Sequence, residues 1–282
     1  MKLSVVISVK NRIKYLNRTL NLLKKQTMNN SDFELVIVDD NSNDNILELL
    51  KSYNCFNIKY IKIDSKLIEH PIFWGPSISN NIGFKAASGE VLMITGPEIL
   101  HKETNFEYGY ESAMNNKIAF AHVYHSGQYF TKLLENNNLM NESFDDLLKL
   151  PNAMESDITH NTFYWFICTV KKEHVMKING CDEEYMKGIC GDDDDFVNRI
   201  EAFGVPRMHD FRMIGIHQDH SNENNLDPLR IRRSAEWEKA RILNTKYLED
   251  WNTIRKSTPF ANIDCDWGSN KVILLKIQLE KI

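Results

Sequence analysis

Four consecutive aspartates at positions 192–195, directly after Gly191, form the densest group of chemically active side chains in the sequence. A helix that begins here would favour one or two of them, because the dipole of a helix places positive charge in its first turn. The remaining carboxylates would repel one another. That cost indicates a functional role for the run, and for Asp192, Asp193 and Asp194 in particular.

Two polar segments follow apolar runs early in the chain. Residues 8–12 read Ser-Val-Lys-Asn-Arg, and residues 39–42 read Asp-Asp-Asn-Ser. Such side chains are common in strand-to-helix turns and caps, so each segment alone has a structural explanation. If both segments leave one edge of a sheet, a carboxylate there can also accept hydrogen bonds from a nucleobase N–H or a ribose hydroxyl.

The elements that would position these residues alternate over the first hundred positions. Apolar, β-branched runs predict strands over 3–9, 34–38, 57–63 and 91–95. Helical apolar stripes predict helices over 12–25, after 42–44, and over 77–87. This alternation predicts an α/β fold, a Rossmann-like and mostly parallel sheet flanked by helices, which binds ligands outside the carboxyl ends of its strands.

The second half is less regular. We expect strands over 118–124 and 162–170 and helices over 192–203 and 234–251. Residues 136–157 are interpreted as a loop with one or two helical turns, and residues 271–282 as a packed terminal strand or short helix.

Composition restricts the class of protein. The 282 residues are 42% hydrophobic and carry a net charge of −5, which argues against a dedicated nucleic-acid-binding protein. The five cysteines form no Cys-x-x-Cys pair and are odd in number, which favours a reduced, cytoplasmic chain over a disulfide scaffold. No apolar run approaches the roughly 18 residues of a transmembrane helix, and the first residues do not resemble a signal peptide.

Residues 3–12 and 36–42 together resemble the opening of family 2 glycosyltransferases of the A-type fold, which read as an apolar strand, a polar loop ending Asn-Arg, and an Asp-Asp-x-Ser turn. The resemblance implies a nucleotide-diphosphate sugar as donor, with Asp39 near its base or ribose. Residues 79–83 are similar to the family's Ala-Arg-Asn-x-Gly helix, with Asn80 in place of the arginine. The residues expected to bind the donor are Ser8, Val9, Asn11, Arg12, Asp39, Asp40 and Asn81.

The family places an Asp-x-Asp pair after the fourth strand, where its carboxylates hold Mn²⁺ or Mg²⁺ against the diphosphate. Here residues 95–101 read Thr-Gly-Pro-Glu-Ile-Leu-His. Only Glu98 offers a carboxylate, and His101 is a poorer candidate ligand. A Pro-Glu pair is also a common helix start, so two alternatives stay open: a metal site rebuilt around one carboxylate, or an enzyme without metal.

The second half resembles the acceptor side of β-1,4-galactosyltransferase-like enzymes, in which Asn-Gly-x-Asp, a Gly-rich loop and Glu-Asp-Asp-Asp follow in order. The match implies Asp193 as the catalytic base, with Asp192 at the family's glutamate; the tryptophan usual in the Gly-rich loop is missing. The same enzymes complete the metal site with a histidine, which His217 matches. His217 and His220 also fit an ordinary polar surface segment, and either His220 or His101 could join the metal.

The resemblance implies one catalytic unit with three parts: a nucleotide-sugar-binding half (1–105), an acceptor and catalytic half (106–225), and a C-terminal helical extension (226–282). The expected reaction transfers a sugar from a nucleotide donor, UDP-linked in the first instance, to a hydroxyl of a glycan or other acceptor. It would invert the sugar carbon, with an Asp base and Mn²⁺ or Mg²⁺ as cofactor.

Two rivals stay open. A sugar nucleotidyltransferase shares the alternation, although it usually carries a glycine-rich loop after the first strand, and residues 9–13 contain no glycine. A glycan- or nucleotide-binding module without turnover would also explain the missing Asp-x-Asp. The basic stretch 230–256 leaves a lipid surface or a nucleic-acid acceptor open as a partner.

Overall fold

The computed structural model describes residues 1–63, 75–135, 139, 141–157, 166–220, 234–255, 257–268 and 277–281. It confirms the predicted alternation of strands and helices over the first hundred residues, with ends that differ by one or two positions in most elements. These elements are β1 (Leu3–Val9), α1 (Ile13–Leu23), β2 (Phe33–Asp39), α2 (Ile46–Lys51), β3 (Ile58–Ile63), α3 (Ser77–Ala86) and β4 (Val91–Thr95).

The later elements are shorter and more varied. They are β5 (Ile99–His101), α4 (Asn105–Met114), β6 (Ile118–His125), α5 (Gln128–Leu133), α6 (Phe144–Leu147), β7 (Ser156–Asp157), β8 (Ile167–Lys171), α7 (Lys172–Lys177), the 3-10 helix η3 (Glu183–Lys187), α8 (Asp192–Ala202), β9 (Arg207–His217), α10 (Ala235–Arg255) and β10 (Ile277–Lys281). The sequence patterns do not predict seven of these described elements: β5, α4, α5, β7, α7, η3 and β9. Part of the strand predicted over 162–170 lies outside the described residues.

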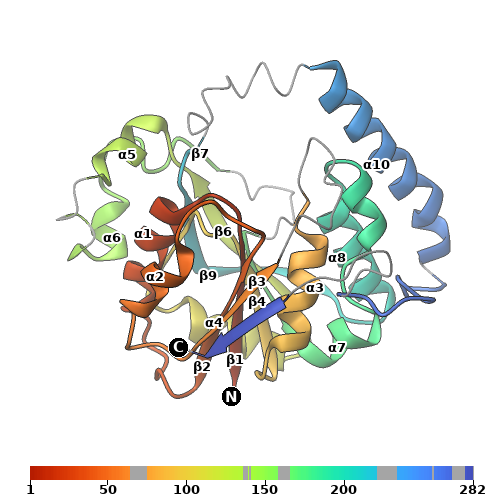
Figure 1. Cartoon of the computed structure of the whole chain (residues 1–282), viewed down its shortest axis with the longest axis horizontal. Coiled ribbons are helices and arrows are strands. Elements are labelled where there is room, and N and C mark those ends of the chain that lie inside the picture. Colours follow the sequence, from red (N-terminus) through yellow and green to blue (C-terminus); the bar gives the residue numbers. More distant parts are fainter. Residues whose placement is uncertain are drawn as a thin grey trace.

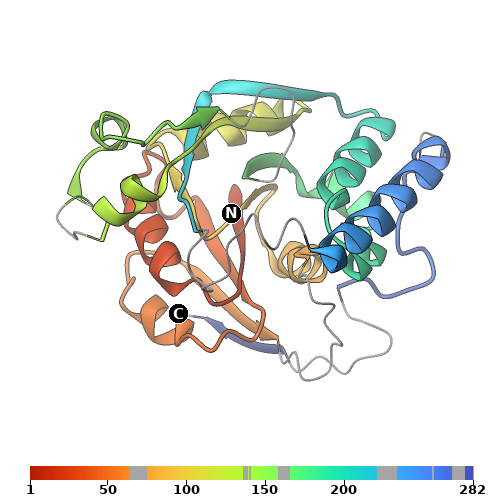
Figure 2. The ribbon, with the colours of Figure 1, turned by 90° about the horizontal axis from the view of Figure 1, so that it is seen from above.

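The strands form one sheet in the order β10-β3-β2-β1-β4-β8-β6-β9-β5, with β7 paired to β6. The β3-β2-β1-β4 part is parallel, as predicted. Beyond β4 the sheet is mixed, because β8 runs antiparallel to both β4 and β6 and β5 runs antiparallel to β9. Figures 1 and 2 show the strands in the centre of the molecule, with helices on both sides.

Alternate residues of the central strands face two separate cores. Val5 and Ile7 of β1 pack with α1, α2 and α4, whereas Val6 packs with α3, α7 and α8. Each fully buried aliphatic side chain contributes about 1.5–3 kcal/mol. α3 lies so close to the sheet that a Cβ on Gly83 would stand 2.4 Å from Val6 Cγ1, which explains the glycine there.

β9 escapes sequence prediction because its alternation is interrupted. Its register with β6 jumps from the pair Ala121–Asp210 to the pair His122–Ile214, so three residues bulge out of β9. Phe211 is 65% exposed and Met213 is fully buried. After the bulge, β9 continues parallel to β6 as far as His217, so the irregular part of the strand lies just before its carboxyl end.

The described residues after 233 contain the helix predicted over 234–251, as α10, and the terminal strand predicted within 271–282, as β10. α10 packs along α8 (Figures 1 and 2). Residues 257–268 then return to the second half, where Asn262 Nδ2 donates to the carbonyls of Asn179 and Cys181. β10 pairs antiparallel with β3 at the end of the sheet. Among the described residues, no helix combines the length and apolar character needed to cross a membrane.

Candidate active site

Six of the described strands end at one edge of the sheet. β1, β2, β3 and β4 are parallel, β6 and β4 share a direction because both run antiparallel to β8, and β9 is parallel to β6. Their carboxyl ends therefore lie together. β5 begins at the same edge, because Ile99 pairs with His217. The edge predicted to bind ligands is thus extended by β6, β9 and β5.

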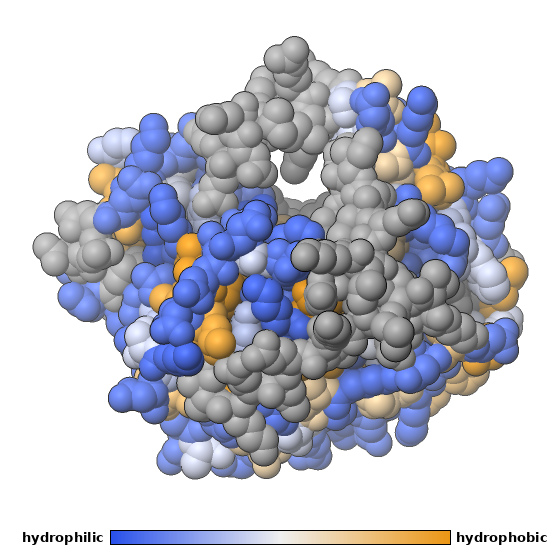
Figure 3. Space-filling model, in the orientation of Figure 1, coloured by the Kyte–Doolittle hydropathy of each residue, from blue (hydrophilic) through white to orange (hydrophobic). Residues whose placement is uncertain are grey.

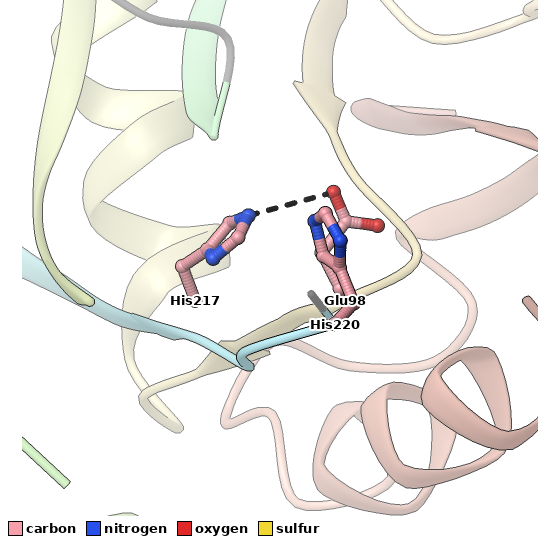
Figure 4. Close-up of side chains that lie close together, drawn as sticks. All are labelled: Glu98, His217 and His220. Carbon is pink, nitrogen blue, oxygen red and sulfur yellow. Dashed lines mark ion pairs between the residues drawn. The ribbon is translucent and has the colours of Figure 1, made fainter. Parts of the chain in front are cut away.

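Glu98, His217 and His220 meet at this edge (Figure 4). Glu98 precedes β5, and its carbonyl oxygen accepts a hydrogen bond from the Gln218 N–H (3.0 Å), which fixes the two segments against each other. Nε2 of His217 lies 3.8 Å from Oε1 of Glu98. Ligand atoms of all three residues lie within 4.8 Å of one another. The structure therefore brings together the two predicted metal ligands and adds His220.

Burial favours the uncharged form of both groups. It raises the pKa of the Glu98 carboxyl, although the nearby Arg12 charge opposes this. Burial, followed by the charges of His220 and His125, lowers the pKa of His217 well below its usual value. When ionised, the Glu98 carboxylate offers oxygen lone pairs to a ligand, and the neutral His217 imidazole offers a nitrogen lone pair. Burial leaves the negative charge of the carboxylate poorly solvated. A bound cation would offset that cost.

Two rings hold the imidazole of His217 in place. His125, the last residue of β6, stacks on it with 4.9 Å between ring centroids, and Nδ1 of each histidine lies 3.0 Å from Nδ1 of the other. Phe166, just before β8, contacts it edge-on at 4.9 Å. Sequence reasoning missed both residues. His125 could have been found, because it directly follows the strand predicted over 118–124 and so lies at the carboxyl edge.

α1 secures the segment after β9. Arg18 Nη1 donates to the Gln218 side-chain oxygen (3.2 Å), and the Tyr15 hydroxyl donates to the Asp219 carbonyl (3.4 Å). The Tyr15 ring also meets the His220 ring edge-on at 6.2 Å. His220 is therefore held toward Glu98 by an element far away in sequence.

Arg12, at the start of α1, faces the same group. Its charge acts on the pKa of both Glu98 and His217. Its Nη1 atom is buried, and no hydrogen-bond acceptor reaches it in the part of the chain that the structure describes. Because an unsatisfied buried donor is costly, this nitrogen is suited to an anionic ligand oxygen.

The two donor loops are bonded to each other. The Asn11 N–H donates to Ser42 Oγ (3.0 Å), and Asn11 Oδ1 accepts from the Asn43 N–H (2.8 Å). The Val9 carbonyl accepts from the Asp40 N–H (2.9 Å), and the Asp40 carboxylate pairs with Lys10 at 3.0 Å. The predicted convergence of the loops at one sheet edge is therefore seen in their hydrogen bonds.

Asp39 is more enclosed than its predicted role suggests. It is fully buried, and its carboxylate accepts from the Ser42 N–H and the Tyr60 hydroxyl, both at 2.7 Å. Ser8 Oγ likewise donates to Asn80 Oδ1 at 2.7 Å. A nucleotide-sugar donor can form a hydrogen bond with Asp39 or Ser8 only if it replaces or shares one of these hydrogen-bond partners.

Two predicted site residues serve the fold. Asn81 is fully buried, and its amide bonds the Cys181 N–H and carbonyl and the Glu183 carboxylate, so it ties α3 to the second half and has no exposed group for a donor. His101 points into the core, where Nε2 lies 3.0 Å from Thr95 Oγ1, and burial lowers its pKa to about 3. The described cluster of possible metal ligands includes His220 and not His101.

The acidic run begins α8 after Gly191, which has the left-handed conformation that favours glycine. Burial raises the pKa of Asp192 to about 6, and burial with the charges of Asp192 and Asp194 raises the pKa of Asp193 well above its usual value. Asp192 and Asp193 are partly exposed, and Asp194 is exposed. Three carboxyls with hindered ionisation thus lie at one helix start.

The fourth aspartate of the run has a structural role. Asp195 is buried and bonds Arg199 Nε at 2.6 Å, one helical turn later. Arg199, fully buried, also donates to the carbonyls of Ile178 and Gly180. The pair therefore fastens α8 to the turn that precedes it.

Among the described residues in the middle of the face shown in Figure 3, hydrophilic side chains predominate, with a few hydrophobic ones between them. In Figure 1, α3, α8 and α10 lie on one side of this face, and α1 and α5 lie on the other. A polar ligand fits this distribution better than an apolar one.

Comparison with known proteins identifies the first part of the chain. Residues 4–167 match the family model described as glycosyl transferase family 2. The poly(ribitol-phosphate) beta-N-acetylglucosaminyltransferase TarS of Staphylococcus aureus (strain Mu50) is 31% identical over 135 residues, 47% of this chain and 21% of that protein. The poly(ribitol-phosphate) beta-N-acetylglucosaminyltransferase TarP of S. aureus (strain N315) is 27% identical over 177 residues, 60% of this chain and 48% of that protein. The chain thus matches about a fifth to a half of the length of these relatives.

Solved structures show the same fold. The crystal structure of S. aureus TarS 1-349 in complex with UDP-GlcNAc matches with a TM-score of 0.59 and 16% identity, over 91% of this chain and 74% of that one. The mannosyltransferase PcManGT from Pyrobaculum calidifontis, in complex with GDP-Man and Mn²⁺, matches with a TM-score of 0.56 and 15% identity, over 92% of this chain and 72% of that one.

These likenesses confirm the predicted A-type fold. The family match ends before α8 and β9, so the resemblance of the second half to β-1,4-galactosyltransferases stays a prediction. With more than half of its length matched by the family model, and with the sheet order and loops described above, the chain belongs to glycosyl transferase family 2.

Proposed function

We propose that this glycosyltransferase moves a sugar from a UDP-linked donor to an acceptor hydroxyl, with inversion at the sugar carbon. The family membership supports the transfer. The names of relatives, which include beta-N-acetylglucosaminyltransferases and a beta-glucosyltransferase, support a hexose-type sugar. A UDP-GlcNAc complex of a structure with the same fold supports uridine.

The observation that carries the proposal is the convergence of Glu98, His217 and His220 at the carboxyl edge of the sheet. One carboxylate and two imidazoles form an oxygen and nitrogen donor set, which suits Mn²⁺ better than Ca²⁺ and admits Mg²⁺ less readily. These residues fit a divalent cation, which would supply positive charge beside the diphosphate when bound. Glu98 and His217 would be the main ligands, and His220 the third.

Arg12 adds a second positive charge to this site. Its buried Nη1, which has no hydrogen-bond partner among the described residues, is suited to a phosphate oxygen, and charge-assisted bonds of that kind are about twice as strong as neutral ones. Arg12 could take over a phosphate contact here, because Asn80 stands where the family has an arginine. Asn11, Asp40, Ser8 and Asp39 would shape the remainder of the donor site, with Val9 contributing through its backbone.

Asp193 is proposed as the general base, supported by Asp192 and Asp194. A raised pKa strengthens a carboxylate as a base, and a value nearer neutrality suits a group that must take and then release a proton. The three carboxyls are neighbours and titrate as a set, so protons are shared among them.

The acceptor is proposed to be a glycan or another hydroxyl-bearing polymer. The hydrophilic side chains that predominate among the described residues in the middle of the face shown in Figure 3 suit a polar acceptor. The structure, which describes all five cysteines, joins no two of them in a disulfide, and this supports the proposed cytoplasmic location.

The test is calorimetry of UDP, UDP-GlcNAc, UDP-glucose and GDP-mannose, each with Mn²⁺ and with EDTA, followed by an assay of nucleotide diphosphate release. We expect a uridine donor to bind tightly only with Mn²⁺, and to be hydrolysed slowly without acceptor. Glu98→Ala and His217→Ala should each remove the Mn²⁺ dependence. Glu173→Ala, which removes an exposed carboxylate of α7, serves as the matched control.

Two results would contradict the proposal. Equal donor binding in Mn²⁺ and EDTA would remove the metal from the site. Binding without any release of nucleotide diphosphate, also with glycan acceptors present, would indicate a binding module instead of an enzyme.

A further inference from the structure

The contact between His125 and His217 is unusual, because both ring atoms involved are Nδ1. The two nitrogens lie 3.0 Å apart, and the rings are inclined by 29°. The residues are paired in register at the ends of β6 and β9, and the Ser126 N–H donates to the His217 carbonyl at 3.0 Å. The strand pairing therefore holds the imidazoles together, independently of a ligand.

A hydrogen bond between two Nδ1 atoms requires that only one of them carries a proton. Two arrangements satisfy this. If His217 donates, its proton is on Nδ1 and its Nε2 has a free lone pair; the neutral His125 then carries its proton on Nε2. If His125 donates, a neutral His217 carries its proton on Nε2, the atom 3.8 Å from Glu98 Oε1.

We infer that His125 is a positioning residue for the metal site, which accepts a hydrogen bond from Nδ1–H of His217 and so leaves the His217 Nε2 lone pair free for the cation. This inference rests on the metal site proposed above. Metal-binding histidines commonly donate their second N–H to a carboxylate, carbonyl or water, which fixes tautomer and ring orientation. Here a neutral imidazole takes the place of that acceptor.

The geometry distinguishes this role from simple packing. Phe166 contacts the His217 ring edge-on and fills space around it. Phe166 offers no hydrogen-bond acceptor, whereas Nδ1 of His125 lies 3.0 Å from Nδ1 of His217 and can accept from it. A side chain that keeps an acceptor at the place of the His125 Nδ1 should therefore preserve metal binding, whatever its other properties.

The experiment compares Mn²⁺ affinity in the full chain, alone and with UDP, by calorimetry and by the electron paramagnetic resonance signal of free Mn²⁺. His125→Asn places an amide oxygen near the lost Nδ1, and His125→Leu fills the space without an acceptor. We expect His125→Leu to weaken Mn²⁺ binding about 10–100-fold. His125→Asn should remain within about threefold of the wild type on the same reasoning. His122→Leu, which removes another imidazole of β6, should leave affinity unchanged.

The outcomes separate the two proposals. If Glu98→Ala and His217→Ala abolish Mn²⁺ binding but His125→Asn and His125→Leu bind Mn²⁺ equally well, the metal site stands and the positioning role of His125 is overturned. Unchanged Mn²⁺ binding in Glu98→Ala and His217→Ala would overturn the metal site and the positioning role with it. Imidazole ¹⁵N chemical shifts of the metal-free wild type give a measure that needs no variant of His125. They should show His217 protonated at Nδ1 and His125 at Nε2, and the reverse pattern would refute the inference.

Discussion

Asn11 allows the donor loops to be tested with two substitutions that separate backbone from side chain. Its φ is 52°, a left-handed conformation that costs most residues about 1–2 kcal/mol and that asparagine and glycine tolerate. Its Oδ1 also accepts the Asn43 N–H, which joins the two loops. Asn11→Ala loses both features, whereas Asn11→Gly loses only the hydrogen bond.

The magnitudes follow from these two contributions. The lost hydrogen bond costs about 1 kcal/mol, and alanine adds the left-handed strain. We therefore expect urea unfolding to show a loss of about 2–3 kcal/mol for Asn11→Ala and about 1 kcal/mol for Asn11→Gly. UDP affinity, measured by calorimetry, should fall in the same order, because the loops that would contact the nucleotide are the ones released.

Asn116, between α4 and β6, provides the control. It has a φ of 59° and lies in a turn away from the carboxyl edge of the sheet. Asn116→Ala should lower stability and leave UDP affinity unchanged. Equal stability of Asn11→Ala and Asn11→Gly would refute the strain argument. A loss of stability without any loss of UDP affinity would remove the loop contact from the donor site.

Three further predictions test other parts of the molecule. Asp193→Asn should bind donor and Mn²⁺ normally while turnover falls about 10²-fold or more, as seen in steady-state kinetics; activity above a third of the wild type would exclude it as the base. Asp195→Ala should lower the free energy of unfolding by about 3–5 kcal/mol because Arg199 stays buried without its partner, whereas Asp194→Ala should change it by less than about 0.5 kcal/mol. His101 has a folded pKa of about 3, below its unfolded value near 6.5, so the unfolded state binds its proton first and stability falls as pH falls between these values. The loss should be about 2 kcal/mol from pH 7 to pH 5 in urea titrations, and His101→Gln should flatten it; an unchanged slope would show that other groups carry the effect.

The first half of the fold was predictable because its signals are local. An unbroken apolar run such as Leu3–Val9 can be read directly from the sequence, since both of its faces are buried. The polar residues that follow each strand then indicate the binding edge. The bond between Asn11 and Ser42 confirms that the two predicted loops meet.

The second half was harder because its signals are distributed. β9 is broken by a three-residue bulge, and β5 has only three residues, so neither shows a clear period. Glu98 and His217 lie close together because β5 pairs with β9, and no local sequence pattern reveals that pairing. Asn81 shows a second limit of local patterns: the motif that marks it as a donor-binding candidate does not reveal that its amide bonds the Cys181 backbone in the second half.

The proposed metal site also differs from the family's in charge, and this has a consequence for mechanism. Two carboxylates of an Asp-x-Asp pair neutralise a divalent cation, whereas Glu98 alone leaves about one positive charge, since both histidines are neutral ligands. With a cation and donor bound, that excess and the Arg12 charge would act together on the diphosphate, at a site where burial strengthens electrostatic interactions. Binding of the cation without nucleotide should be weaker for the same reason, because fewer negative charges would hold it. Two neutral imidazoles in place of a second carboxylate would therefore make cation binding depend on the donor phosphates, and metal and nucleotide should bind together.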